Sequence, residues 1–167
     1  MNVLDAIAHT LKREGIEYLC TFPTTHIIES AAELGIRPII CRQERVGVGM
    51  ADGYARATGK PAFVNLHIET GLANGLSLLH NAKEGGTPMV VTSANKDIRK
   101  LAEGRSELAE MVRLFAKWSV EVTDPAQIPS VMRRAFTEAK TPPTGPVYVG
   151  FSANALDGEA DMEIIPS

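Results

Sequence analysis

The segment "RQERVGVGMADGYARATGKP", Arg42 to Pro61, has the pattern of a helix but an unsuitable composition. Gly47, Gly49 and Gly53 fall inside it. Each costs about 1 kcal/mol relative to alanine in a helix interior. A lone carboxylate, Glu44, stands at the start of the same segment. A helix weakened three times directly behind one acid requires a physical reason.

Helical and strand patterns alternate on both sides of this segment. Helices are predicted at 2–15, 25–35, 42–60, 70–83, 106–116 and 124–140, and strands at 16–22, 37–41, 61–67, 87–94, 117–123 and 144–151. Short buried strands alternating with helices predict an α/β fold, a doubly wound, mainly parallel six-stranded sheet with helices on both faces. Residues 1–152 are expected to form this domain, and 153–167 a tail or the start of a linker.

Composition narrows the class of protein. Seventeen Lys and Arg against twenty Asp and Glu give a net charge of −3 with no basic stripe, so a nucleic-acid partner is not expected. The longest apolar runs, such as "PVYVGF", are far too short for a membrane span, and the N-terminus has no signal-peptide pattern. A cytoplasmic protein is predicted. Cys20 and Cys41 have no metal-binding or C-x-x-C spacing and are expected to be reduced and buried.

Polar residues gather just past the predicted strands. In parallel α/β sheets ligands bind outside the carboxyl ends of the strands, so this edge is the predicted site. Four consecutive strands deliver to it a carboxylate, two histidines and several hydroxyls: Thr21, Phe22, Pro23, Thr24, Thr25 and His26, then Arg42, Gln43 and Glu44, then His67, Glu69 and Thr70, then Ser93 and Asn95.

Each of these residues also has a structural interpretation. Glu44 in a first helical turn complements the helix dipole. Thr25 and Thr70 are ordinary N-cap residues, and His26 either caps its helix or lies in solvent. His67 at a strand end is more often a hydrogen-bonded structural histidine than a catalyst. Ser93 and Asn95 serve simply to end a strand.

The glycines leave two interpretations open. Gly49 and Gly53 share one helix face, and Gly47 with Ala51 forms a second smooth strip. Such strips permit close packing, either on the helix's own sheet or against a second subunit. A nucleotide-binding interpretation is weak, because "GVGMADG" is one residue too long for G-x-G-x-x-G and lies inside the helix.

The longer stretch "RQERVGVGMADGYARATGKPAFVNLH" resembles the pyrimidine-binding domain of thiamine diphosphate-dependent decarboxylases and synthases. That family, whose domain is flavodoxin-like, carries a glutamate, a run of small residues and an "ADGYAR-x-(T/S)GK" segment in this order. The resemblance extends from "GIEYLCTFPTT" to "GPVYVGF". Within the family, "PAFVNLH", "HNAKEGGTPMVVT", "KWS" and "GPVYV" are most similar to benzoylformate decarboxylase, with acetolactate synthases more distant.

The resemblance implies roles for the residues at the predicted edge. Glu44 matches the glutamate that hydrogen-bonds N1′ of the cofactor's aminopyrimidine, which requires a site without water. His67 matches a histidine that transfers protons at the substrate stage. Thr25 takes the place of a substrate-contacting serine. Pro23, Thr24 and Thr70 are expected beside the cofactor.

Two departures from the family pattern bear on the substrate. Thr24 stands where the family has glycine, which implies an altered oxoacid pocket. "HIETGLAN" replaces a small-residue run and brings Glu69 near the thiazolium. An added carboxylate is expected to repel an anionic oxoacid or to bind a cationic group, which argues against benzoylformate as the substrate.

The family's "GDG…N" motif, which holds the cofactor's diphosphate through Mg²⁺, does not occur in this sequence. The resemblance therefore implies half an active site, completed by a diphosphate-binding domain of a longer chain or of a separate subunit, as in sulfopyruvate decarboxylase. It also implies a homodimer through the Gly47–Gly53 helix and a small 2-oxoacid substrate. The alternative of a different class is a non-catalytic flavodoxin-like assembly module.

Overall fold

The computed structural model describes residues 1–23 and 27–167, with the backbone alone at 101 and 102. Within that part of the chain the strands form a six-stranded sheet in the order β2-β1-β3-β4-β6-β5. Every pairing in this sheet is parallel, so the predicted parallel sheet is confirmed. The strands are β1 (Tyr18–Thr21), β2 (Arg37–Ile40), β3 (Ala62–Leu66), β4 (Met89–Asn95), β5 (Trp118–Val122) and β6 (Pro146–Ser152).

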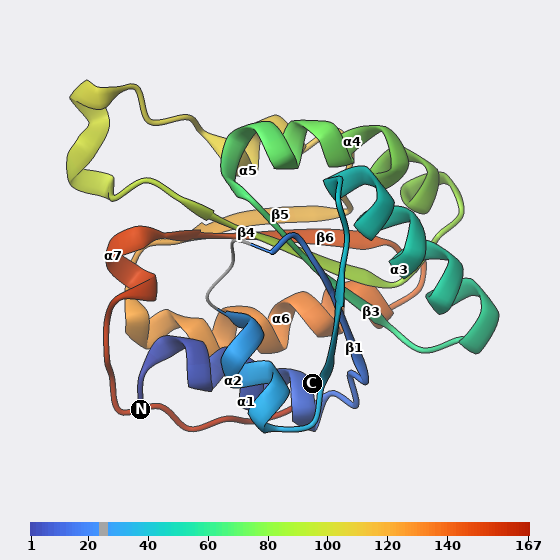
Figure 1. Cartoon of the computed structure of the whole chain (residues 1–167), viewed down its shortest axis with the longest axis horizontal. Helices are drawn as coiled ribbons and strands as arrows, with labels where there is room; N and C mark the ends of the chain where they lie inside the picture. The colour runs from blue at the N-terminus through green and yellow to red at the C-terminus, as the bar shows by residue number, and fades with distance from the viewer. Residues whose placement is uncertain (24–26) are drawn as a thin grey trace.

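Helices cover both faces of the sheet, as the alternating pattern predicts. Figure 1 shows α3, α4 and α5 on one face and α1, α2 and α6 on the other. None of the helices in the described ranges combines the length and the hydropathy needed to cross a membrane. The helices are α1 (Val3–Arg13), α2 (Ile27–Glu33), α3 (Glu44–Thr58), α4 (Ile68–Glu84), α5 (Leu108–Val112), α6 (Ile128–Lys140) and α7 (Ala153–Leu156), with 3₁₀ helices at Ile98–Glu103 and Pro125–Gln127.

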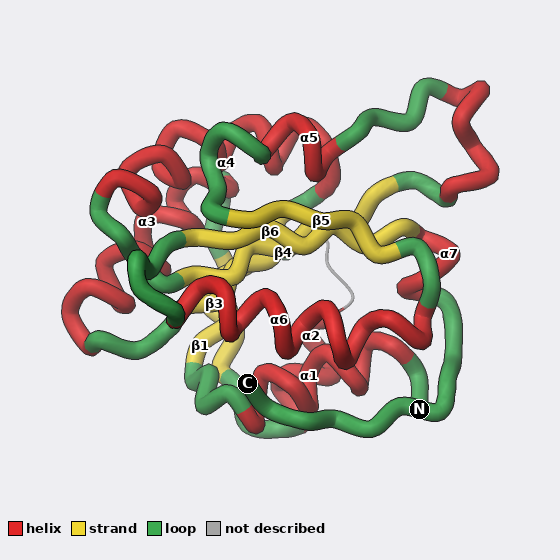
Figure 2. The backbone as a smooth tube through the Cα atoms, turned by 180° about the vertical axis from the view of Figure 1, so that it is seen from behind, coloured by secondary structure: helices red, strands yellow, loops and turns green. Residues whose placement is uncertain are grey.

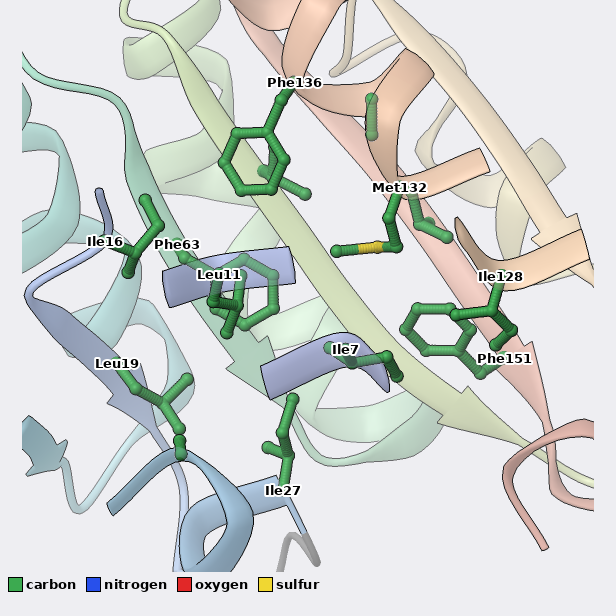
Figure 3. Packing of buried hydrophobic residues seen from close by; sticks show 14 of the residues in the cluster. Ile7, Leu11, Ile16, Leu19, Ile27, Phe63, Ile128, Met132, Phe136 and Phe151 are labelled. Carbon is green, nitrogen blue, oxygen red and sulfur yellow. The ribbon is translucent and has the colours of Figure 1, made fainter. Parts of the chain in front are cut away.

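A hydrophobic layer lies between the sheet and each layer of helices. Ile7 and Leu11 of α1 pack with Phe63 of β3 and Phe136 of α6 on one face (Figure 3). On the other face Val48 of α3 belongs to a second cluster, with alternate residues of β3. The alternation follows from the strand period of two, which sends successive side chains to opposite faces.

The strand order reverses between β1 and β3, and open α/β sheets bind ligands at such a switch point. Thr21 at the end of β1 is paired with Ile40 of β2 and with Asn65 of β3. Leu66 is paired in turn with Ser93 of β4. The segments that follow these strands therefore begin at the same edge of the sheet, which is the edge at which the sequence predicts the site.

Three helix boundaries differ from the predicted ones. α5 ends at Val112, because the chain then closes in tight turns such as the Phe115 N to Val112 O hydrogen bond of 2.8 Å. The helix predicted from Asp124 begins instead with a 3₁₀ turn, and Asp124 caps it by accepting from Ala126 N. α4 begins two residues early, at Ile68, so Thr70 lies inside its first turn and is not its N-cap.

The segment after β6 is ordered along the rest of the domain. It forms α7 and then runs back beside α1, so that both termini lie on the α1 side of the sheet (Figure 2). Asn2 forms a β-bridge with Glu159, and Ser167 Oγ donates to Glu14 at 2.9 Å. Ile164 is buried, with 6% of its surface exposed. The predicted tail thus packs on the domain over part of its length.

Both cysteines are buried and free, as predicted. Burial raises the pKa of the Cys20 thiol to about 11, and burial likewise raises the pKa of Cys41. Thiols of this kind are poor nucleophiles, because the thiolate is the reactive form. They act here as small hydrophobic side chains.

Candidate functional site

Glu44 is the first residue of α3 and is buried, with 9% of its surface exposed. A carboxylate that caps a helix accepts hydrogen bonds from backbone N–H groups of that helix. In the described structure the hydrogen bond of Glu44 is made to another element instead. Asn74 of α4 donates through Nδ2 to Glu44 Oε2 at 3.1 Å. The carboxylate is therefore oriented by α4 rather than used to cap α3.

Gly71 provides the space that the Glu44 side chain occupies. A Cβ atom on Gly71 would lie 2.5 Å from Glu44 Oε1 and 2.8 Å from Glu44 Cδ. Carbon atoms do not approach this closely without displacement. Gly71 and Asn74 are three residues apart on one helix and share a face. Together they form a cradle, which we call the α4 cradle, for the Glu44 carboxylate.

Glycine occurs at the three positions of α3 for different physical reasons. A Cβ on Gly47 would lie 3.0 Å from Cys41 Sγ, and one on Gly49 would lie 3.0 Å from Leu78 Cδ1 of α4. Close packing within the chain explains both. Gly53 is exposed and has nothing within 4 Å of its added Cβ. Packing inside this chain therefore leaves Gly53 unexplained.

His67 is the N-cap residue of α4 and is half-buried. Its ring stacks near the Phe22 ring, with centroids 6.3 Å apart and an interplanar angle of 22°. Within the described residues the imidazole makes no hydrogen bond, so the interpretation as a hydrogen-bonded structural histidine gains no support. Both ring nitrogens remain available to a molecule bound at this edge.

The turn after His67 is strained. Ile68 has φ = +41° and is the single non-glycine residue with positive φ in the described chain. A β-branched residue in this region is a rare conformation that costs about 1–3 kcal/mol and that occurs preferentially at functional sites. The turn places two side chains with proton-transfer or charge chemistry, His67 and Glu69, on either side of Ile68.

Glu69 is paired with a cation. Its Oε1 atom is buried and makes no hydrogen bond, but it lies 3.8 Å from Lys96 Nζ. Lys96 follows β4 and also donates to Gly104 O at 3.0 Å. The charge that Glu69 adds to this edge is therefore offset by a neighbouring charge, which weakens the predicted repulsion of an anionic substrate.

The polar residues at the end of β4 bind other parts of the fold. Ser93 Oγ lies 2.7 Å from the Tyr148 hydroxyl, and burial raises the pKa of Tyr148. Asn95 Nδ2 donates to Glu121 Oε1 at 3.0 Å and to Ser106 O at 2.9 Å. Both side chains therefore hold neighbouring strands and the loop after β4 together. Ser93 does not end the strand as its structural interpretation predicts, because β4 continues to Asn95.

The predicted site residues divide into three groups. Glu44 lies against α4, whereas His67 borders a cavity on the α1 side of β3. Pro23 and Thr70 are exposed at the same edge. Thr24, Thr25 and His26 lie outside the described residues. Gly71 and Asn74 were not predicted from the sequence; the available signal was a glycine and an asparagine three residues apart in the first turns after a strand.

Comparison with known proteins identifies the class. Residues 1–115 match the family described as the thiamine pyrophosphate enzyme, N-terminal TPP binding domain. The chain is 37% identical over 118 residues to the benzoylformate decarboxylase of Pseudomonas aeruginosa, covering 68% of this chain and 22% of that protein. It is 30% identical over 160 residues to the acetolactate synthase large subunit of Haemophilus influenzae, covering 92% and 28%.

Solved structures agree with this match. An enzyme of Mycobacterium smegmatis described as thiamin diphosphate-dependent has a TM-score of 0.85 and 26% identity, covering 94% of this chain and 31% of that one. The fold is also that of the 4-hydroxybenzoylformate decarboxylase of Rhodococcus jostii, with a TM-score of 0.88, 24% identity and coverage of 97% and 32%. The chain thus belongs to the N-terminal, pyrimidine-binding domain family of thiamine pyrophosphate enzymes, and it spans less than a third of the length of these relatives.

Proposed function

We propose that this chain is the pyrimidine-binding half of a thiamine diphosphate-dependent 2-oxoacid decarboxylase or carboligase, with Glu44 as the residue that activates the cofactor. The observation that carries the proposal is the α4 cradle. Asn74 donates to one oxygen of the buried Glu44 carboxylate, and Gly71 leaves room for the other. A helix-capping acid needs neither feature.

The residues present fit the aminopyrimidine of this cofactor. Glu44 Oε1 has no hydrogen bond among the described residues, and a carboxylate oxygen can accept from a protonated ring nitrogen. When bound, thiamine diphosphate supplies a nucleophilic thiazolium carbon and an aminopyrimidine that receives the proton from it. Glu44 holds the proton at N1′ of the ring, and Asn74 fixes the direction in which the carboxyl faces. Glu44 is itself buried, with 9% of its surface exposed, whereas Asn74 lies at an exposed position of α4.

The substrate side of the site is assigned to His67. Its unpaired imidazole, at the carboxyl end of β3, is suited to donate and accept protons on the bound oxoacid or its product. Thr25 is proposed to contact the same substrate, and Pro23, Thr24 and Thr70 to line the cofactor. The diphosphate and its Mg²⁺ are proposed to be held by a partner domain, since the motif that holds them is absent from this sequence.

We place residues 1–152 as the domain, with 153–167 leading toward a further domain of a longer chain. The alternative is a free subunit of a split decarboxylase of the sulfopyruvate type. An immunoblot of the source cells separates the two, because a band near 18.0 kDa means a separate subunit. A band about three domains in size means a longer chain.

The test of the proposed function uses the assembled enzyme, meaning this domain together with its diphosphate-binding domain. Thiamine diphosphate and Mg²⁺ are expected to be required for release of CO₂ from a panel of 2-oxoacids that includes pyruvate and benzoylformate. A non-catalytic assembly module gives no turnover with any oxoacid and no change in melting temperature on addition of the cofactor. That pair of results would exclude the proposal.

Replacing His67 with alanine is expected to slow the chemistry and to leave cofactor binding intact. Loss of a positioned acid–base group costs about 10²–10⁴-fold in rate. The measurements are kcat in the assembled enzyme and the dissociation constant of thiamine diphosphate. His80→Ala serves as the control, because His80 is exposed on α4 and packs only edge-on against Phe115. If His67→Ala weakens cofactor binding but leaves kcat unchanged, His67 is a structural residue.

Gly53 is expected to lie in a contact between two copies of this domain through α3. Its exposed surface has no neighbour within 4 Å of an added Cβ, so Gly53→Leu adds a side chain only to that contact. Sedimentation should show the dissociation constant of the dimer raised by about 5- to 150-fold, because a misfitting side chain costs about 1–3 kcal/mol. Ser130→Leu, at an exposed position of α6, is the control. A wild-type chain that stays monomeric at high concentration contradicts the contact.

A further inference from the structure

A group of polar side chains joins α3 to α4 at the ends of these helices that lie away from the site. Arg56 Nε donates to Asp52 Oδ1, one turn earlier on α3, at 2.8 Å. Arg56 Nη2 donates to the Asn81 carbonyl oxygen, in the last turn of α4, at 3.1 Å. The Thr87 hydroxyl, between α4 and β4, donates to the same Asp52 oxygen at 2.6 Å. We call these four residues the distal clamp, because they tie the end of α3 to the end of α4 and to the start of β4.

Gly85, the C-cap residue of α4, leaves room for the guanidinium of the clamp. A Cβ atom on Gly85 would lie 2.6 Å from Arg56 Cζ. The φ of Gly85 is −80°, which any residue adopts, so the backbone alone does not require glycine here. The charge of Arg56 also complements the partial negative charge at the end of a helix.

The clamp differs from an ordinary surface ion pair within one helix. Such a pair contributes little to stability and needs neither a hydroxyl from another element nor space on a neighbouring helix. Here only 16% of the Asp52 side chain is exposed, and one of its oxygens accepts from both Arg56 and Thr87. The contacts between elements therefore require an explanation beyond the pairing of two charges.

Between the clamp and Glu44, the two helices meet through glycine. Figure 1 shows α3 and α4 side by side on one face of the sheet. A Cβ on Gly75 of α4 would lie 3.3 Å from Val48 Cγ2, and one on Gly49 of α3 would lie 3.0 Å from Leu78 Cδ1. Glycine allows close approach, but it offers no side chain that interlocks with the other helix and resists sliding along the axis. The offset between α3 and α4 must therefore be fixed elsewhere.

The clamp and Glu44 lie on one ridge of α3. Glu44, Val48, Asp52 and Arg56 follow one another at intervals of four residues, which is the spacing of a helix ridge. Arg56 follows Glu44 at a distance of about 18 Å along the axis, at 1.5 Å per residue. A continuous helix transmits an axial shift from one end to the other.

The Glu44 carboxylate is sensitive to such a shift. Asn74 Nδ2 reaches Glu44 Oε2 at 3.1 Å, so a displacement of about 1 Å breaks this hydrogen bond. A misplacement of about 1 Å can cost roughly a hundredfold in rate even when its cause lies far from the chemistry. The geometry at the α4 cradle thus depends on what fixes α3 at its far end.

We propose that Asp52 and Arg56 are positioning residues for Glu44. Through the distal clamp they fix the offset of α3 relative to α4 and so hold the Glu44 carboxylate in the α4 cradle. The inference rests on the proposed function, in which Glu44 meets the aminopyrimidine of the cofactor. It gives the acid and the arginine of the "ADGYAR" segment a role at the end of α3 opposite to the site.

The first test loosens the clamp and keeps its charge. In Arg56→Lys a single nitrogen replaces the fork that donates to both Asp52 and the Asn81 carbonyl. In the assembled enzyme kcat is expected to fall at least about tenfold. In a Glu44→Gln background the same substitution should change kcat less than about twofold, because the carboxyl that the clamp positions is already gone.

The matched control is Arg113→Lys, since Arg113 forms an exposed ion pair with Glu110 of α5. It should leave kcat unchanged in both backgrounds. A merely structural role of Arg56 would instead lower kcat by the same factor with and without Glu44, and that result would overturn the proposal.

The second test approaches the clamp from Thr87 and covers the case in which Arg56→Lys does not fold. Thr87 is buried, with 2% of its surface exposed. Thr87→Ser keeps the hydroxyl that donates to Asp52, whereas Thr87→Val keeps the shape and removes the hydroxyl. The kcat of Thr87→Val is expected to lie at least about threefold below that of Thr87→Ser. Equal kcat values in the two folded variants contradict the clamp.

A third measurement needs no turnover. Gly71→Ala forces its Cβ against the Glu44 side chain, and a loosened clamp lets α3 move away from it. Effects at independent distant sites multiply within about twofold in the unfolding equilibrium constant. We expect the factor by which Gly71→Ala raises that constant to be at least about threefold smaller in Arg56→Lys than in the wild type, and unchanged in Arg113→Lys. Denaturant unfolding of the chain measures all of these values.

These measurements separate the two proposals. Absence of turnover with every oxoacid rejects the proposed function, while the unfolding measurements still decide whether the clamp fixes α3 on α4. Independent effects of Arg56→Lys and Gly71→Ala on unfolding reject the clamp even in an active enzyme. An unchanged kcat in folded Arg56→Lys rejects the positioning role. Coupling of Arg56 to Gly71 in unfolding, together with coupling to Glu44 in kcat, supports the inference.

Discussion

Replacing Glu44 with glutamine in the assembled enzyme is expected to lower kcat by at least about a hundredfold, the size of effect that a positioned acid–base group contributes. Glutamine keeps the length of the side chain and its carbonyl oxygen, which still accepts from Asn74 Nδ2. Its amide does not share a proton with a ring nitrogen of the cofactor. The chemistry is therefore lost while the contact with α4 is retained.

The fold of this variant is expected to be unchanged. Glu44→Gln should melt within a few degrees of the wild type, which a thermal melt of the assembled enzyme measures. Glu110→Gln is the matched control. Glu110 forms an exposed ion pair with Arg113 at 2.7 Å, and such pairs contribute little to the stability of the fold. Wild-type turnover by a correctly folded Glu44→Gln variant would remove the central claim about this site.

Gly71→Ala is expected to damage the same site while Glu44 itself is retained. The added Cβ would lie 2.5 Å from Glu44 Oε1 and 2.9 Å from Glu44 Cγ, so the side chain must move. Overpacking of this kind costs about 1–3 kcal/mol of stability. We expect kcat/KM to fall at least about tenfold, because a displaced acid no longer meets the ring nitrogen.

Two comparisons isolate that clash. Gly53→Ala changes the same residue type at an exposed position of α3, where no atom lies within 4 Å of the added Cβ, so it should stabilise the monomeric chain by about 1 kcal/mol. In a Glu44→Ala background the clashing atoms are gone, and Gly71→Ala should then cost little or nothing. A coupling energy near zero between positions 44 and 71, measured by denaturant unfolding of all four variants, contradicts the cradle.

The parallel sheet and the alternation of strands with helices could be predicted from the sequence, because buried strands and helices carry recognisable patterns of apolar residues. Strand β3 has five buried residues in succession, as a central strand covered on both faces requires. The boundaries were less accurate. A proline stands at the start of both the 3₁₀ turn and α6, so the sequence does not separate the two. The early start of α4 at Ile68 depends on a strained φ that no propensity predicts.

The site was predicted in part. The topology of parallel strands brings residues that follow successive strands to one edge, so Glu44 and His67 could be found without coordinates. Asn74 could not be found in this way, because its role depends on how closely α4 approaches α3.

The sequence by itself determined the class of fold, the family and the edge at which the chemistry is expected, because periodicity and motif order are properties of the chain alone. The tertiary structure decided what the three glycines of α3 do. Gly47 and Gly49 fit Cys41 and Leu78, while Gly53 faces outward. The reason is geometric: a glycine's use depends on which atom lies where its Cβ would be, and distant segments supply that atom.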